Sequence, residues 1–215
     1  FQLSSASHAA LLLPGLMPLF IILLLVAVNR EAQTKSKWLG VGIITLGVSL
    51  MFGQAVADTQ SLSYSVLEGD LWFVAGSFFW ALFSVLIKRW NITPWQVTVS
   101  LAFFTAVIYL PVYILYLPKS IVNATGGDIL LQVIYQGLLA TIIQMIFYVK
   151  AVHTIGPSSM GVMMAIVPLV SGISAIFVFD ETATLTLLLG LLSVSVGAWV
   201  AHSQFSQNSL INRSV

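Results

Sequence analysis

Long apolar stretches alternate with short polar segments along the whole chain. A helix that crosses a bilayer needs about 20 predominantly apolar residues, and seven stretches approach or reach that length. They are approximately His8–Asn29, Trp38–Val56, Leu71–Ile87, Val97–Leu117, Ile129–Val149, Pro157–Phe179 and Leu185–His202. The segments between them are short and rich in turn residues, for example "NITP" and "NATGGD". The pattern predicts an all-α polytopic membrane protein in which seven transmembrane helices form one bundle.

The composition supports a membrane location. Hydrophobic residues make up 59% of the chain and charged residues 7%, whereas soluble domains carry roughly 25% charged residues. The eight Lys and Arg and the seven Asp and Glu residues all lie between or just beyond the apolar stretches. The net charge of +1 argues neither for nor against a nucleic-acid partner, but the chain has no basic block, and we expect no such partner. The chain has no Cys, and its three His residues lack metal-ligand spacing, so we expect no metal and no cofactor.

The distribution of positive charge predicts the orientation, because Lys and Arg are in excess in the cytoplasmic loops of membrane proteins. Seven of the eight Lys and Arg residues fall on one predicted side, and Lys119 alone falls on the other. We therefore expect the C-terminus in the cytoplasm and Phe1 outside. We expect the membrane to be a bacterial inner membrane.

An internal repeat links the first two stretches to the last two. Shifting the sequence by 150 residues superimposes two segments without a gap, and four landmarks coincide. The matched pairs are Pro18 with Pro168, Glu31 with Glu181, Gly40 with Gly190, and Gly47 with Gly197. The two copies start five helices apart, and an odd number of helices reverses direction. The copies are therefore predicted to be inverted across the membrane, as in many secondary transporters.

The repeat also predicts sequence before Phe1. The second copy belongs to a unit of five helices, but the first shows only its last two. At the same offset the other three helices, roughly 80 residues, would precede Phe1. We therefore expect the chain to be a fragment.

Two segments resemble a known family. Phe79–Trp90, "FWALFSVLIKRW", resembles the opening helix of an EamA unit in the drug/metabolite transporter superfamily. Tyr135–Trp199 resembles the last three helices of that unit, including its Pro, its closing Glu and its Gly-containing final helix. The resemblance implies ten helices in two inverted units of five, in which the seven stretches are helices 4–10. It implies two closing helices of the first unit in residues 1–56, an external linker over 57–69, a complete second unit over 70–202, and a cytoplasmic tail over 203–215.

Polar residues inside the apolar stretches are the candidates for solute binding, because a transporter site lies near the midplane at the repeat interface. In the fifth stretch Gln136, Gln144 and Tyr148 fall on a four-residue spacing beside Thr141. In the third stretch Ser77, Trp80 and Ser84 share one helical face. Ser171 is the candidate from the sixth stretch. The alternative role for all of these residues is hydrogen bonding or packing between helices.

A second set of residues is predicted to shape the helices. Pro18 and Pro168 remove a helical hydrogen bond and permit kinks. Small residues let another helix approach closely, and Glu31 and Glu181 close the twin helices through a contact with the following loop. The structural set is Pro18, Pro168, Gly161, Gly172, Gly40, Gly190, Glu31 and Glu181.

We expect a transporter, exporting or exchanging a small neutral or zwitterionic metabolite such as an amino acid, by alternating access. The partners are then the lipid bilayer and the solute, and the sequence leaves a homodimer open. No Asp or Glu lies inside a stretch, so the pattern disfavours an enzyme. An intramembrane enzyme and a non-transporting seven-helix protein are the alternatives.

Overall fold

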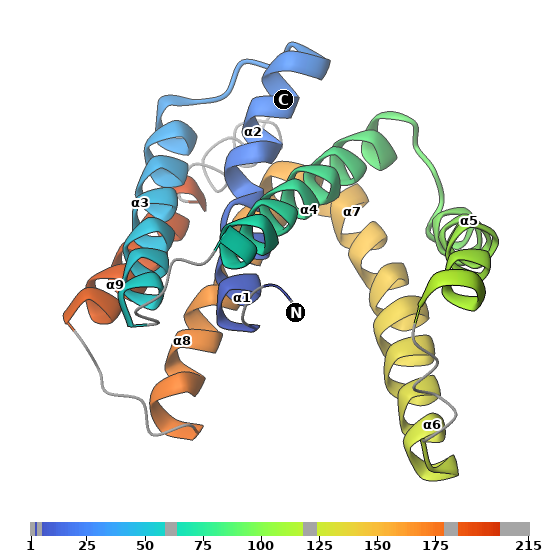
Figure 1. Ribbon diagram of the computed structural model, residues 1–215. Coiled ribbons are helices and arrows are strands. Elements are labelled where there is room, and N and C mark those ends of the chain that lie inside the picture. The colour runs from blue at the N-terminus through green and yellow to red at the C-terminus, as the bar shows by residue number, and fades with distance from the viewer. Residues whose placement is uncertain (1–2, 4–5, 59–63, 118–123, 179–184, 203–215) are drawn as a thin grey trace. The chain divides into compact units, whose positions relative to one another are not determined.

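The computed structural model describes residues 3, 6–58, 64–117, 124–178 and 185–202, and every regular element in these ranges is helical (Figure 1). The elements are α1 (Ala6–Gly15), α2 (Met17–Asn29), α3 (Lys35–Asp58), α4 (Tyr64–Arg89), α5 (Pro94–Tyr116), α6 (Gly126–Gln132), η2 (Val133–Ile143), α7 (Gln144–Met164), α8 (Ile166–Val178) and α9 (Leu185–His202). The predicted all-α polytopic fold is confirmed.

Five helical segments are long and apolar enough to cross a membrane. They are Leu11–Asn29, Lys35–Gly53, Tyr64–Arg89, Pro94–Tyr116 and the 46-residue segment Gly126–Ser171. The last one contains the fifth predicted span and residues 157–171 of the sixth, and it is kinked at Gly156. Leu188–Ala201 is a shorter apolar helix. The number of seven spans stays a prediction.

The chain forms two compact units. One unit combines Phe1–Val85 with Pro157–Val215, and the other is Leu86–Gly156. The first unit therefore contains the described parts of both repeat copies. The second unit contains α5, α6, η2 and the first part of α7.

In the first unit, proline residues interrupt the helices of both repeat copies. The break between α1 and α2 falls at Leu16, and the break between α7 and α8 falls at Ala165. Pro18 and Pro168 follow these breaks and cannot donate the backbone hydrogen bond that would continue the preceding helix. Gly161 of α7 packs against Pro18 of α2, since a Cβ on Gly161 would lie 3.3 Å from the Pro18 Cα.

Repeat-equivalent glycines of α3 and α9 touch each other. A Cβ on Gly40 would lie 2.6 Å from the carbonyl oxygen of Gly197, and one on Gly47 would lie 2.7 Å from that of Gly190. These distances allow no side chain, so the two backbones are in direct contact. The helices lie side by side and antiparallel in Figure 1. The 150-residue shift carries the pair Gly40–Gly197 onto the pair Gly190–Gly47. The repeat therefore exchanges the two glycine contacts of this interface with each other.

The core of this unit follows the same symmetry. Ile44, Val48, Ala165 and Val194 form one fully buried cluster, and Ala198 packs against it. Ile44 and Val194 are equivalent in the repeat, as are Val48 and Ala198. A residue that meets its own equivalent lies on the axis relating the two copies. The inverted repeat therefore has a physical counterpart in the packing.

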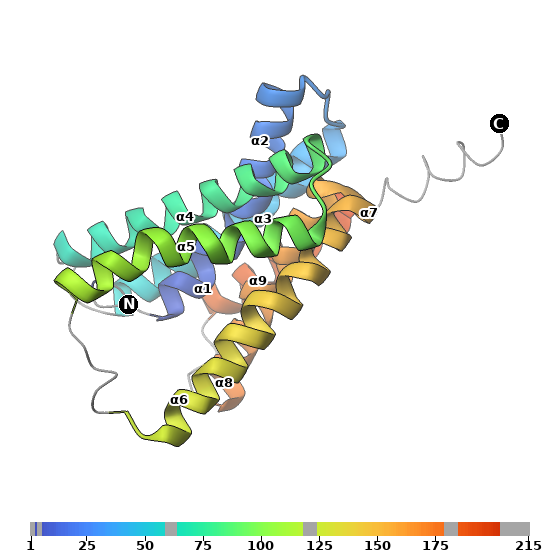
Figure 2. The same cartoon turned by 90° about the vertical axis from the view of Figure 1, so that its right-hand side faces the viewer.

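In the second unit, two helix starts are closed by their own side chains. Thr93 and Gln96 form a capping box at the start of α5, and Thr125 and Asp128 form one at the start of α6. The chain from α6 through η2 into α7 is continuous in Figures 1 and 2. Over Val133–Ile143 it is a π-helix, in which each N–H bonds to the carbonyl five residues earlier.

Candidate solute-binding site

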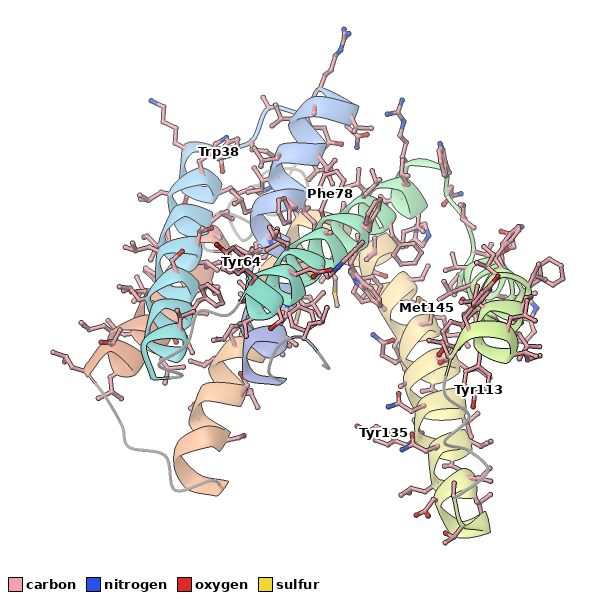
Figure 3. All side chains as sticks on the ribbon, in the orientation of Figure 1. Trp38, Tyr64, Phe78, Tyr113, Tyr135 and Met145 are labelled. Carbon is pink, nitrogen blue, oxygen red and sulfur yellow. The ribbon has the colours of Figure 1, made fainter. Side chains whose placement is uncertain are left out.

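The predicted polar face of α4 is buried in the first unit. Ser77 and Ser84 are both 0% exposed, and Trp80 between them is half-buried and lies against Phe83. The residue after Ser77 is Phe78, which is labelled in Figure 3. Its ring meets the ring of Phe20 of α2 edge-on, with ring centres 5.7 Å apart. The structure therefore brings Ser77, Trp80 and Ser84 together on a helix that packs inside the unit.

Most hydroxyl groups in the helices bond to a carbonyl of the preceding turn. Ser84 Oγ donates to the carbonyl of Trp80 at 2.8 Å, and Ser195 Oγ donates to that of Leu191 at 2.8 Å. Ser77 Oγ is different, because it is buried and has no hydrogen-bond partner among the described residues. A buried polar group that lacks a partner costs about 1–3 kcal/mol. The Ser77 hydroxyl therefore has an unused hydrogen bond among the described residues.

The candidates of the fifth predicted span are not gathered on one buried face. Gln136 and Gln144 are exposed, Thr141 is intermediate, and Tyr148 is 3% exposed. The spacing of four aligns residues on an α-helix, but Gln136 and Thr141 lie in the π-helix. There the Thr141 hydroxyl donates to the carbonyl of Gln136, five residues back, at 2.6 Å. Each hydrogen bond of a π-helix spans five residues and not four, so residues spaced by four no longer lie on one face of the helix.

The remaining predicted residues fall in three places. Ser171 bonds locally, its Oγ donating to the carbonyl of Pro168 at 2.9 Å. Glu31 is exposed in the loop after α2, where its Oε1 accepts a 2.9 Å hydrogen bond from the side chain of Asn29. Gly172 lies in α8, and Glu181 lies outside the described residues.

The structure has a helix break at Gly156, between the predicted fifth and sixth stretches, where the sequence predicts a turn. This residue has φ 83° and ψ 157°, a conformation open to glycine and strained for other residues. Pro157 follows and has no N–H, so the carbonyl of His153 has no partner four residues on. The Lys88 Nζ donates to that carbonyl instead. The His153 ring nitrogen Nε2 lies 2.8 Å from the carbonyl of Ile92. Lys88 and His153 therefore fix the end of the first part of α7.

The break places two further serines at the start of a helix. Ser158 is 9% exposed and Ser159 is 3% exposed. Ser159 Oγ is buried and has no hydrogen-bond partner among the residues that the structure describes. The dipeptide Gly156–Pro157 was available as a signal of a helix start, but the burial of the following serines cannot be seen in the sequence.

Together these features define a class of protein. A helical fold with five segments that are long and apolar enough to cross a membrane is that of a polytopic integral membrane protein. Residues 67–202 match the EamA-like transporter family. Because this match covers more than half of the chain, the protein belongs to the EamA-like transporter family.

One curated relative is similar over most of the chain. It is a Bacillus subtilis (strain 168) protein described as an uncharacterized transporter, YyaM, with 26% identity over 193 residues. The alignment covers 86% of this chain and 63% of that protein. The chain therefore spans less than two thirds of the relative's length. No solved structure matches the chain.

Proposed function

We propose that this protein transports a small neutral or zwitterionic metabolite, such as an amino acid, across a bacterial inner membrane. The C-terminus lies in the cytoplasm in this proposal, and the protein works as an exporter or exchanger. Membership of the EamA-like family supports transport in general. The absence of Asp and Glu inside the predicted spans favours a solute without net charge.

The observation that carries the mechanism is the self-matching contact of α3 with α9. Gly40 meets Gly197, and Gly47 meets Gly190, through backbone atoms. Two inverted copies joined at such an interface can exchange conformations, so that one copy adopts the state that the other leaves. This exchange opens the site to each side of the membrane in turn, which is alternating access.

Ser77 is the proposed contact for a polar group of the solute. Its hydroxyl is buried without a hydrogen-bond partner among the described residues, and Trp80 on the same helical face provides an apolar wall. A hydroxyl that bonds only the solute has a recognisable signature. Its removal weakens solute binding and leaves the stability of the solute-free protein unchanged or higher.

The test is counterflow in liposomes containing the protein expressed from its native gene. Liposomes are loaded with each neutral L-amino acid in turn, and uptake of the radiolabelled form is measured. We expect uptake that requires the protein, and a several-fold weaker apparent affinity in Ser77→Ala. Ser195→Ala is the matched control, because its hydroxyl already bonds the Leu191 carbonyl. Failure of every neutral or zwitterionic solute to show protein-dependent counterflow would overturn the proposal.

A further inference from the structure

The turn between α4 and α5 lies at a membrane boundary. Tyr64–Arg89 and Pro94–Tyr116 are both long and apolar enough to cross a membrane, and only residues 90–93 separate them. A chain that leaves one span and enters the next over so short a segment turns at the level of the lipid headgroups. The turn has a defined shape, because a capping box of Thr93 and Gln96 starts α5.

The end of the first part of α7 is fastened to this turn. Lys88 Nζ donates to the His153 carbonyl, and His153 Nε2 lies 2.8 Å from the carbonyl of Ile92. Lys150 lies almost one turn before His153 on the same helix. The end of α4, the start of α5 and the end of the first part of α7 therefore meet within the second unit.

Positive charge collects where these helix ends meet. Lys88, Arg89 and Lys150 are all exposed, and the only acidic residue in the sequence of the second unit is Asp128. Asp128 lies at the start of α6, where it accepts a hydrogen bond from the Thr125 hydroxyl. At about 1.5 Å per helical residue, Asp128 and Lys150 are on the order of 30 Å apart along the continuous helix. No carboxylate in the sequence of this unit therefore lies near the three cations.

Two tryptophans flank the same turn. Trp90 is 62% exposed and Trp95 is 65% exposed. Tryptophan is enriched where membrane proteins meet the lipid headgroups, because its ring is apolar and its N–H can donate a hydrogen bond. Lys and Arg side chains likewise combine an apolar stem with a charged end. Such a combination of side chains suits a ligand that has both acyl chains and an anionic phosphate.

A second basic segment offers an internal comparison. The loop after α2 also contains exposed Arg30 and Lys35, close in sequence to Trp38, which is 40% exposed. There, however, Glu31 directly follows Arg30. A carboxylate among the cations weakens their attraction for a phosphate. The turn between α4 and α5 has no such carboxylate, so it is the stronger anion-binding surface of the two.

We propose that a basic patch, formed by Lys88, Arg89, Trp90, Trp95 and Lys150, binds the headgroup of an anionic phospholipid. The Arg89 guanidinium and the Lys150 ammonium bind the phosphate oxygens, and a guanidinium matches phosphate geometry especially well. The two indole rings pack against the glycerol and the first part of the acyl chains. Lys88 fastens α7 to the turn and so keeps Lys150 at the same end as Arg89. This inference does not depend on which solute the protein transports.

Thermal unfolding of the purified protein in maltoside micelles measures the binding. Phosphatidylglycerol is titrated into the micelles, and phosphatidylcholine, whose headgroup has no net charge, and inorganic phosphate are titrated separately. The test variant carries Arg89→Gln and Lys150→Gln together. The matched control carries Arg30→Gln and Lys35→Gln, which remove the same charge from the segment that contains Glu31. All four substituted residues are exposed, so both variants should fold.

We expect phosphatidylglycerol to raise the melting temperature of the parent protein at a lower concentration than phosphatidylcholine does. Each lost Lys or Arg at an anionic headgroup should weaken the apparent affinity about fivefold, and the test variant should therefore need about 25 times more phosphatidylglycerol. The control variant should keep the affinity of the parent.

Three results would overturn the proposal. Equal losses in the two variants would mean that any basic residue serves and that no defined site exists. Equal stabilisation of the parent by phosphatidylglycerol and phosphatidylcholine would mean that the charge of the headgroup is not recognised. Stabilisation by inorganic phosphate without any effect of phosphatidylglycerol would mean that the patch binds a free ion and not a lipid.

Discussion

Placing a methyl group at Gly40 tests whether α3 and α9 are in backbone contact. The new Cβ would lie 2.5 Å from the Ala201 nitrogen and 2.6 Å from the Gly197 oxygen. Ordinary contacts start at 3.4 Å, so the helices must separate by about 0.9 Å at this point. Both neighbours are backbone atoms and cannot rotate away. Overpacking of this kind costs about 1–3 kcal/mol.

The helix propensity of alanine offsets part of that cost, because Gly→Ala gains up to about 1 kcal/mol inside a helix. We therefore expect Gly40→Ala to lose about 1–2 kcal/mol of unfolding free energy. At about 2–4 °C per kcal/mol for a chain of this size, the melting temperature should fall by about 2–8 °C. The assay is thermal unfolding of the purified protein in detergent.

Two other glycines make the test specific. Gly42 lies on the same helix, and a Cβ there would meet nothing within 4 Å, so Gly42→Ala should be neutral or stabilising. At Gly190 the tightest neighbour is the flexible Met51 side chain. Gly190→Ala should therefore cost less than Gly40→Ala. Equal stability of Gly40→Ala and Gly42→Ala would refute direct backbone contact, and with it the symmetric interface.

Two further changes address the break in α7. Lys88→Met leaves the His153 carbonyl without its donor, so we expect the unfolding free energy to fall by about 1–3 kcal/mol. Lys88→Arg keeps a donor and should be closer in stability to the parent protein. An unchanged melting temperature for Lys88→Met would contradict the role of Lys88. Gly156→Ala forces a side chain into a positive φ and should cost about 1–2 kcal/mol, whereas Gly137→Ala, which meets no neighbour within 4 Å, should not destabilise. Both are read by thermal unfolding, and equal effects of the two alanines would argue against the break.

The membrane fold could be predicted because the bilayer leaves few choices. Backbone groups in lipid must bond within a helix, so each apolar stretch of sufficient length becomes helical. The stretch predicted over 185–202 has the same bounds as α9, Leu185–His202. The ends of α4 differ more, since the helix begins at Tyr64, in a segment too polar for the hydropathy pattern to include.

The arrangement of polar side chains was harder to predict. A spacing of four residues implies one face only if the helix is an α-helix, and η2 is not. Nothing in "VIYQGLLATII" indicates the π-helix. The polar face of α4 was predictable because α4 is regular, so the seven-residue spacing from Ser77 to Ser84 survives in the structure. The contact of Gly161 with Pro18 and Ile21 joins helices that lie far apart in the sequence.

The repeat was readable in the sequence, but its physical meaning emerged from contacts. Equivalent residues of an inverted repeat meet where they lie on the axis, as Ile44 meets Val194. The sequence identifies the pairs of equivalents without saying which of them are close. Glycine at four equivalent positions in α3 and α9 was the signal, because only glycine allows backbones to approach so closely.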